Sequence, residues 1–448
     1  MLINSCRDIR VFCEVCRVHY QVLVSVLFIA TVTMLAFEVK RHIVAVFTIV
    51  SLLVLGLISP RDFYVLVDWD VVGLVVCMSV YSAILEISGF ARWAAWGVAK
   101  RIKRPLLLLY MLILLSGLVS LILENTVTVF IFAPVVLAVA SLLNIDVKKL
   151  LVGIALAAGM SGSATMIGDP PAIIVAGRYN LAFTDFIIYE SKPSMFFITL
   201  IPMIVATGAH VLYNFRHTKI KRIDPDELGV NTINKKFVFE ALVFLLVKIL
   251  LLSLRRELHL SLTLPALIAL SGIYVTRIAL HRDYECVKKS LKEGLDYKLP
   301  LFLVSIFLLS GSLKRYEVTD IVAGYIVKYV GTSTLVLGIV VFAISALLSS
   351  LIENIPVTLT LIPVVDYIAP QIGVSPIILV WGMLSGLTAG GGYTYIGSGA
   401  NVVAVHILDS KGSKITFSGF TKTALAFNIV NTTLVLALYT AIWLLQLV

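Results

Sequence analysis

Two short polar motifs interrupt a mostly apolar sequence and hold the residues best suited to chemistry. The first motif occurs twice and combines carboxylate, amide and hydroxyl groups: Glu124, Asn125 and Thr126, then Glu353, Asn354 and Thr358. Oxygen atoms of these kinds bind hard cations such as sodium. An ionisable residue inside a membrane is costly and by default marks a functional site. One copy alone would also fit a surface loop, but the recurrence of Glu-Asn favours a site.

The second motif is rich in glycine, proline and hydroxyl residues and also occurs twice. Its candidate binding residues are Thr165, Gly168, Asp169 and Pro170 in the first copy and Thr394, Gly397, Ser398 and Asn401 in the second. Glycine and proline interrupt helices, so each copy should leave free backbone groups at two helix ends. Carbonyl and hydroxyl oxygens suit sodium, helix N termini suit anions, and the glycines would also allow close helix packing. We predict a candidate sodium site at Asn125, Asp169, Asn354 and Asn401.

The composition indicates which elements must position these motifs. Of 448 residues, 59% are hydrophobic and 14% are charged, whereas a soluble domain has about 25% charged residues. Apolar runs of about 18 to 20 residues recur, and runs such as 105–123 lack the alternation of a membrane β-barrel. The sequence therefore predicts an all-α, multi-pass protein of the cell membrane, with the lipid bilayer as its partner. The net charge of +10 comes from Lys and Arg clusters between spans, which argues against nucleic acid.

The two halves of the chain are related by a fixed shift of 229 residues. Subtracting 229 from residues of the second copies, such as Glu353 and Gly397, gives those of the first, Glu124 and Gly168, without gaps. An internal repeat in a membrane protein is typical of secondary transporters. We expect four segments: N-terminal spans at 1–63, a first inverted repeat at 64–215, a linker with connecting spans at 216–298 and a second inverted repeat at 299–448.

Charge placement predicts that the two repeats have opposite orientations in the membrane. Basic residues without acids follow the first span of the first repeat, at 92–104, whereas the equivalent stretch 320–333 has one acid and one base. The segments before these spans show the opposite bias. By the positive-inside rule we predict a cytoplasmic location for 92–104, 216–236 and 281–298, while the side of the N-terminus stays open.

Three segments within the motifs resemble a known group of transporters: LIENIPVTLTLIPVV, IGDPPAIIVAG and IGSGANVVAV. They resemble signatures of the ion transporter superfamily, in particular the branch of arsenite permeases, NhaD-type sodium/proton antiporters and the melanosomal P protein, and more distantly the divalent-anion/sodium symporters. The resemblance covers about 70–180 and 299–410. It implies about 11 to 13 transmembrane helices in two inverted repeats, each with a re-entrant hairpin and a broken helix, around a midplane site. It also implies elevator-like alternating access and a homodimer.

The sequence departs from this family pattern in two places. Gly-Asp-Pro-Pro is usually followed by Asn, but Ala172 stands there, so one expected ligand of the first loop is missing. The tips carry Glu124 and Glu353 where the family usually has Asp or Ser, which changes the reach of each side chain. The resemblance implies that the tip and helix-break residues given above bind the transported ion.

The carboxylates favour a cation or a neutral molecule as cargo. A dianion would meet Glu124, Glu353 and Asp169 at low dielectric, which is unfavourable unless they are protonated. Burial should favour their neutral form until a cation binds, so one site could alternate between proton and sodium. We therefore expect a secondary active transporter that works by sodium/proton antiport. The alternatives are proton antiport of arsenite or another small inorganic oxyanion, and sodium-coupled symport of a citrate- or dicarboxylate-like anion.

Other classes of function find less support. GMSG at 159–162 matches the Gly-x-Ser-Gly of intramembrane serine proteases, with His210 as a candidate base, but the duplication already accounts for this segment. No Gly-x-x-x-x-Gly-Lys-[Ser/Thr] occurs, so the chain itself is not expected to hydrolyse ATP, although a separate ATPase subunit stays open. We expect no enzyme activity and no cofactor other than sodium or a proton as coupling ion. Three N-terminal cysteines (Cys6, Cys13, Cys16) give no clear metal site.

Overall fold

The computed structural model describes residues 2–37, 39–102, 104–216 and 234–445. Residues 217–233 of the predicted segment 216–298 lie outside the described residues, as do the side chains of the three N-terminal cysteines. Eight helices are long and apolar enough to cross a membrane, and four shorter apolar helices accompany them within the described chain. The prediction of a helical multi-pass membrane protein is confirmed.

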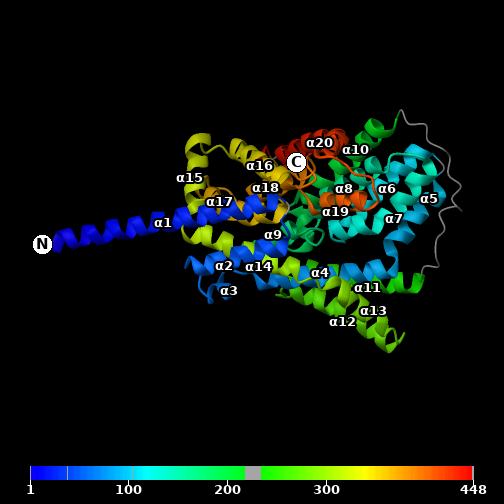
Figure 1. Cartoon of the computed structure of the whole chain (residues 1–448), viewed down its shortest axis with the longest axis horizontal. Coiled ribbons are helices and arrows are strands. Elements are labelled where there is room, and N and C mark those ends of the chain that lie inside the picture. Colours follow the sequence, from blue (N-terminus) through cyan, green and yellow to red (C-terminus); the bar gives the residue numbers. More distant parts are fainter. Residues whose placement is uncertain (1, 38, 103, 217–233, 446–448) are drawn as a thin grey trace.

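The elements follow one another in four groups (Figure 1). The N-terminal group is α1 (Leu2–Ala36), α2 (Arg41–Val54) and α3 (Asp62–Val65). The next group is α4 (Trp69–Ser88), α5 (Phe90–Arg101), α6 (Pro105–Ser120), α7 (Asn125–Leu143), α8 (Val147–Ser161), η1 (Gly162–Ala164), α9 (Pro170–Arg178), η2 (Phe183–Phe186), the antiparallel pair β1 (Ile188–Tyr189) and β2 (Lys192–Pro193), and α10 (Met195–Phe215). Then come α11 (Lys235–Ser253), α12 (Thr263–Ala279) and α13 (Tyr284–Gly294). The last group is α14 (Lys298–Arg315), α15 (Val318–Val330), α16 (Thr334–Leu351), α17 (Asn354–Gln371), α18 (Pro376–Gly390), α19 (Gly399–Ser410), α20 (Phe417–Tyr439) and the π-helical turn η4 (Thr440–Leu444).

Local sequence signals set the ends of several helices. Pro105, Pro170 and Pro376 begin α6, α9 and α18, where the missing N–H of proline leaves no helical hydrogen bond unmade. Gly89 and Asn144 end α4 and α7 with φ of 80° and 52°, the left-handed conformation that commonly closes a helix.

The helices repeat with the same shift of 229 residues as the motifs. α6, α7, α8 and α9 begin 229 residues before α16, α17, α18 and α19. Residues that precede equivalent helices also share a backbone conformation. Glu124 and Glu353 have φ/ψ of −56°/138° and −60°/148°, and Asp169 and Ser398 have −148°/140° and −145°/138°. The duplication therefore extends from sequence to backbone geometry.

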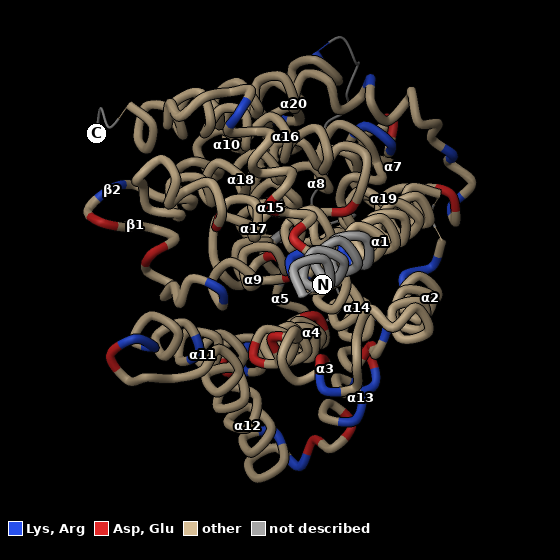
Figure 2. The backbone as a smooth tube through the Cα atoms, turned by 90° about the vertical axis from the view of Figure 1, so that its left-hand side faces the viewer, with Lys and Arg blue, Asp and Glu red and all other residues tan. Residues whose placement is uncertain are grey.

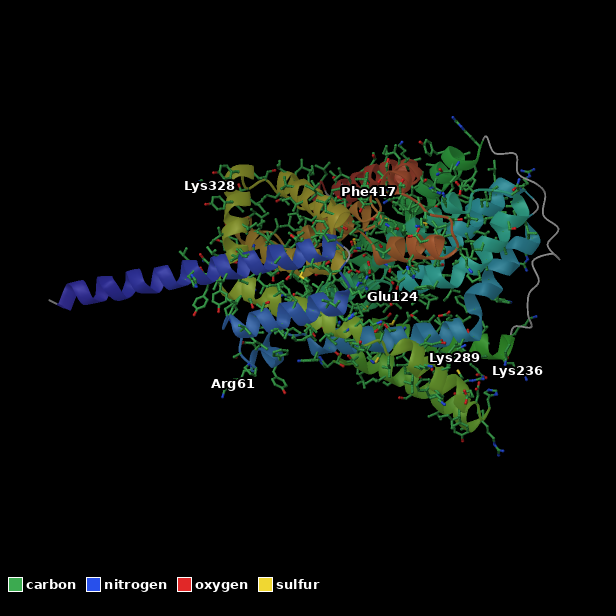
Figure 3. The ribbon with its side chains drawn as sticks, in the orientation of Figure 1. Arg61, Glu124, Lys236, Lys289, Lys328 and Phe417 are labelled. Atoms are coloured by element: carbon green, nitrogen blue, oxygen red, sulfur yellow. The ribbon has the colours of Figure 1, made fainter. Side chains whose placement is uncertain are left out.

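Equivalent parts of the two repeats lie at opposite ends of the molecule, as inverted repeats require. α5 lies at the right-hand end of Figure 1 and α15 at the left-hand end, where α1 also begins. Figure 3 places Lys236 and Lys289 at the right-hand end and Arg61 and Lys328 at the left-hand end, with Glu124 between them. The predicted inverted-repeat fold is therefore confirmed, whereas the cytoplasmic assignment of the right-hand end stays a prediction.

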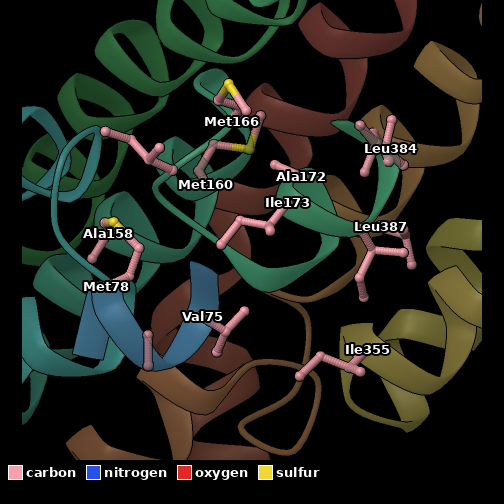
Figure 4. Packing of buried hydrophobic residues seen from close by; sticks show 14 of the residues in the cluster. Val75, Met78, Ala158, Met160, Met166, Ala172, Ile173, Ile355, Leu384 and Leu387 are labelled. Atoms are coloured by element: carbon pink, nitrogen blue, oxygen red, sulfur yellow. The ribbon is translucent and has the colours of Figure 1, made fainter. Parts of the chain in front are cut away.

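The helices pack as two groups, and Figure 2 shows α2–α4 and α11–α14 of one group below α16–α20 of the other. We name α6–α10 with α16–α20 the site bundle, and α1–α4 with α11–α14 the flanking bundle. α5 and α15 contact helices of both bundles and connect them. The apolar core is continuous between the bundles. Figure 4 shows Val75 of α4, Ile173 of α9, Ile355 of α17 and Leu387 of α18 in the same cluster of buried residues.

Hydroxyl groups satisfy the backbone where the hairpins and helix breaks lie inside the molecule. Ser120 and Ser349 donate hydrogen bonds to carbonyl oxygens of α8 and α18, at 2.9 and 2.8 Å. Thr165 and Thr394 donate to the carbonyl oxygens of the residues that follow Ser120 and Ser349, at 2.5 and 2.6 Å. Irregular backbone at membrane depth is tolerated only when such groups are paired or line a cavity. These four bonds hold each helix break against the hairpin of its own repeat.

Glycine is required where each helix break approaches its hairpin most closely. A Cβ at Gly168 would lie 2.6 Å from the carbonyl oxygen of Ser120, and a Cβ at Gly397 would lie 2.4 Å from that of Ser349. Both separations are below van der Waals contact, and backbone carbonyls cannot swing aside as side chains can. The two glycines therefore allow the close packing that the sequence offered as an alternative to ligand binding.

Gly168→Ala is expected to lower the free energy of unfolding by about 3 kcal/mol, because the new methyl group would force the backbone apart. The thermal unfolding midpoint of purified protein in detergent measures this. Gly324→Ala is the control, since the described structure leaves its Cβ position in α15 open and alanine is the better helix former. Equal midpoints for both variants would contradict the predicted close approach.

Candidate functional site

The two hairpin tips and the two helix breaks meet at one cavity of about 20 Å³. Its lining residues are Arg41, Glu124, Asn125, Thr126, Asp169, Pro170, Leu299, Glu353, Asn354, Ile355, Ser398 and Gly399. A volume of this size holds about one water-sized species. The structure thus brings together the tip residues Glu124, Asn125, Thr126, Glu353 and Asn354 with Asp169 and Ser398 of the helix breaks.

Four helices of the site bundle point their N termini at this cavity. The residues before α7, α9, α17 and α19 are Glu124, Asp169, Glu353 and Ser398, and in these four described positions no side chain caps its own helix. The first turn of a helix has unpaired N–H groups and a partial positive charge. The cavity therefore combines carboxylates with backbone donors that could face an anion.

Each repeat completes the binding surface of the other. α7 packs against α19, and α9 packs against α17. A Cβ at Gly399 would lie 2.8 Å from Cγ2 of Thr126, so the N-terminus of α19 touches the first tip directly. On the second tip, Ser349 shares its one hydroxyl hydrogen between the carbonyl oxygen of Leu387 and Oδ1 of Asn354, at 2.8 and 2.5 Å. Neither repeat alone would form the cavity.

The three carboxyl groups of the cavity have different partners. Glu124 accepts a hydrogen bond from the hydroxyl of Thr126 at 2.7 Å. Glu353 forms an ion pair with Arg41, the first residue of α2. Asp169 is 4% exposed, and within the described chain its Oδ2 has no hydrogen-bond partner. Sequence reasoning missed Arg41, because a basic residue before an apolar span resembles an ordinary interfacial charge.

Asn354 and Ser398 also line a second cavity, of about 10 Å³. Four buried side-chain oxygens that line it have no hydrogen-bond partner in the described structure: Oγ of Ser398 and Oδ1 of Asn401, Asn428 and Asn431. Unpaired amide and hydroxyl oxygens suit a hard cation or a water molecule. Asn428 and Asn431, one turn apart in α20, were not expected from the sequence, where two amides within an apolar helix were the available signal.

The remaining candidate residues make backbone contacts. Thr358 donates its hydroxyl to the carbonyl oxygen of Asn354 at 2.8 Å. Thr165 and Thr394 hold the helix breaks to the hairpins, and Gly168 and Gly397 allow that approach. The structure gives these five residues positioning contacts and places none of their side chains among those that line the two cavities within the described chain.

The candidate sodium residues divide between the two cavities. Asn125 and Asp169 line the first, Asn401 lines the second, and Asn354 lines both. Among the described residues, no three His, Cys, Asp or Glu side chains are grouped to hold a metal ion. Glu124, Asp169 and Glu353 line the first cavity, so a cation there would have at most two of these carboxylates among its ligands, and amide, hydroxyl and backbone oxygens would supply the rest. A cation in the second cavity would bind to amide, hydroxyl and backbone oxygens.

The protease alternative finds no catalytic pair in the geometry. The hydroxyl of Ser161 donates to the backbone carbonyl of Ala157 at 2.9 Å. The ring of His210 bonds instead to the backbone carbonyl of Lys149, also at 2.9 Å. Both groups thus have structural partners.

Comparisons with known proteins agree with a transporter fold. The sequence model of the CitMHS family, described as citrate transporter, matches residues 25–287 and 241–447. The 46 kDa membrane protein of Mycobacterium leprae is 28% identical over 426 residues, which cover 92% of this chain and 96% of that protein. The P protein of Homo sapiens is 24% identical over 448 residues, 82% of this chain and 52% of that protein. The crystal structure of the Alcanivorax borkumensis YdaH transporter has a TM-score of 0.58 at 14% identity and covers 86% of this chain and 90% of that one.

The two tip carboxylates should respond differently to neutralisation. Glu353→Gln leaves the guanidinium of Arg41 without its anion and is expected to cost about 1–2 kcal/mol of stability, less than a fully buried pair because Arg41 is 34% exposed. Glu124→Gln keeps an oxygen that can accept from Thr126 and should change stability by less than about 0.5 kcal/mol. Thermal unfolding midpoints in sodium-free detergent solution measure both. A larger loss for the Glu124 variant would contradict the assigned partners.

Proposed function

This chain belongs to the CitMHS citrate transporter family, and we propose that it is a secondary transporter that exchanges sodium ions for protons at the cavity between its hairpin tips. It is a multi-pass membrane transporter by family and by fold. The observation that carries the finer proposal is the convergence of Glu124, Glu353 and Asp169 on a cavity of about 20 Å³.

The charge of the cavity supports a cation as its occupant. Three ionised carboxylates against one arginine would leave an excess of negative charge in a site largely removed from water. Protons relieve that excess when no metal ion is present, and a sodium ion relieves it when the protons leave. The same groups then bind either ion but not both. This mutual exclusion is what couples the two fluxes in an antiporter.

The second cavity gives sodium a place beside the carboxylates. Asn354 of the second tip and Ser398 of the second helix break line both cavities. An ion bound in one cavity would therefore contact residues that also form the other cavity. The free oxygens of Asn401, Asn428 and Asn431 would replace water around a dehydrated cation. We assign the asparagine-lined cavity as the second place where sodium binds.

A second candidate function is sodium-coupled symport of a citrate-like carboxylate anion. Its support is the set of four helix N termini around the cavity, together with Arg41 and the family description. The cavity of about 20 Å³ would have to widen to admit such an anion. Separation of the two hairpin tips would provide the space.

Proteoliposomes that contain a pH-sensitive dye test the proposal. An inward sodium gradient should drive protons out of the vesicles without any added anion. In the double variant Glu124→Gln/Glu353→Gln, this proton flux should fall at least tenfold. Of the described residues that line the cavity, Asp169 would then hold the one carboxyl group left, and it cannot exchange as many protons for sodium as three carboxyl groups can. Asp366→Asn is the control, because that carboxylate pairs with Arg178 away from the cavity.

The outcomes separate the candidate functions. Flux that survives in the double variant would refute carboxylate-based exchange. Proton or sodium movement that requires citrate on the same side as sodium would replace antiport by anion symport. Movement that requires arsenite would favour the arsenite alternative.

A further inference from the structure

Arg41 is the charged contribution of the flanking bundle to the cavity. Of the described residues that line it, Arg41 and Leu299 lie in the first turns of α2 and α14 of the flanking bundle, and the others belong to the hairpins and helix breaks of the site bundle. The ion pair between Arg41 and Glu353 therefore joins one bundle to the other. Its acidic partner, Glu353, is also one of the carboxylates proposed to bind the transported ion.

Alternating access moves one group of helices against another, and we take the site bundle and the flanking bundle as these two groups. A side chain on the flanking bundle cannot accompany the site bundle, so it can contact Glu353 in only part of that motion. Leu299 lies near the middle of the apolar span Tyr284–Arg315, and Figure 3 shows Glu124 between the two ends of the molecule. The ion pair thus stabilises this one arrangement of the two bundles as long as Glu353 is ionised and has no other cation.

We propose that Arg41 is a latch that holds the site bundle in this position while the cavity is empty, and that a sodium ion or proton on Glu353 displaces it. The latch rests on the proposed function, because it uses Glu353 as an exchanging carboxylate. Arg41 acts as an internal cation that competes with the cargo. Occupation of the cavity is thereby linked to release of the bundle that must carry it.

The surroundings of Arg41 suit a guanidinium that moves. A Cβ at Gly399 would lie 3.1 Å from Nη2 of Arg41, so the glycine leaves room for the group at the start of α19. The Arg41 side chain is 34% exposed while that of Glu353 is 16% exposed, so protein does not enclose the arginine on all sides. The other titratable groups that line the cavity with Glu353 are Glu124 of the first tip and Asp169 of the first helix break, and α14 and α19 present Leu299, Ser398 and Gly399.

A second ion pair between the bundles provides a matched control. Arg256, in the connection between α11 and α12, pairs with Asp185 of η2 at 2.9 Å. Neither residue lines the cavity. Loss of this pair would loosen the bundle contact without changing what competes for Glu353.

Sodium binding to the purified chain in detergent tests the competition. The rise of the thermal unfolding midpoint with sodium chloride concentration reports affinity. Arg41→Gln should bind sodium about fivefold or more tightly than the wild type, because its internal competitor is gone. Arg41→Lys keeps the positive charge, so its sodium affinity should lie between those of the wild type and Arg41→Gln. The lysine variant also provides the test if the glutamine variant does not fold. Arg256→Gln should bind sodium as the wild type does.

Transport tests the release of the bundle. Two fluxes of radiolabelled sodium are measured in proteoliposomes: net efflux into sodium-free buffer, which needs the empty site bundle to return, and sodium-for-sodium exchange, which does not. The ratio of net efflux to exchange should rise several-fold in Arg41→Gln, since the empty bundle is no longer held. Unchanged sodium affinity together with an unchanged flux ratio would overturn the latch. Loss of both fluxes in Arg41→Gln but not in Arg41→Lys would assign Arg41 to cargo binding and would also overturn it.

A neutral second tip keeps the latch separate from the sodium proposal. If the wild type shows neither sodium binding nor sodium flux, the proposed exchange fails, and the latch is tested through the ion pair alone. In a protein that already carries Glu353→Gln, adding Arg41→Gln should leave the unfolding midpoint unchanged, because no carboxylate is left there to hold the guanidinium. A change as large as the one that Arg41→Gln causes when Glu353 is present would overturn the latch.

Discussion

Pairing of backbone groups away from water is the constraint on which this architecture depends. A membrane-embedded hairpin or broken helix exposes N–H and C=O groups where no solvent can reach them. Here the hydroxyls of Ser120, Thr165 and their equivalents supply the missing partners, and Gly168 and Gly397 let the chains come close enough. The N–H groups at the four helix starts around the cavity have no capping side chain from the residue that precedes each helix. These N–H groups are therefore what the helix starts can offer to a ligand.

Much of this architecture could be predicted because the two repeats share residue types as well as spacing. Glu124 and Glu353 recur at the same shift as Gly168 and Gly397, and the structure keeps that register in its helix starts. A hairpin tip needs a polar residue between two apolar runs, and this pattern can be recognised in the amino-acid sequence alone. The same holds for the opposite charge bias of equivalent loops.

Contacts made by packing could not be predicted in the same way. Arg41 and Glu353 are 312 residues apart, and no spacing rule relates a helix start in one bundle to a hairpin tip in the other. Nor can a sequence show whether a threonine beside a helix break turns its hydroxyl to an ion or to a carbonyl. At Thr165 and Thr394 the backbone carbonyl is the partner. Asn428 became notable only once α20 was packed beside the second helix break.

The position of Arg41 outside both repeats has a consequence for energetics. In an inverted duplication, exchanging the conformations of the two halves turns one end state into the other, so two halves of identical sequence would give two states of equal energy. Arg41 precedes the first repeat and breaks that degeneracy. A bias of about 1.4 kcal/mol populates one state tenfold over the other. Such a bias makes transport faster in one direction than in the other. The ion gradient that is reached at equilibrium stays the same.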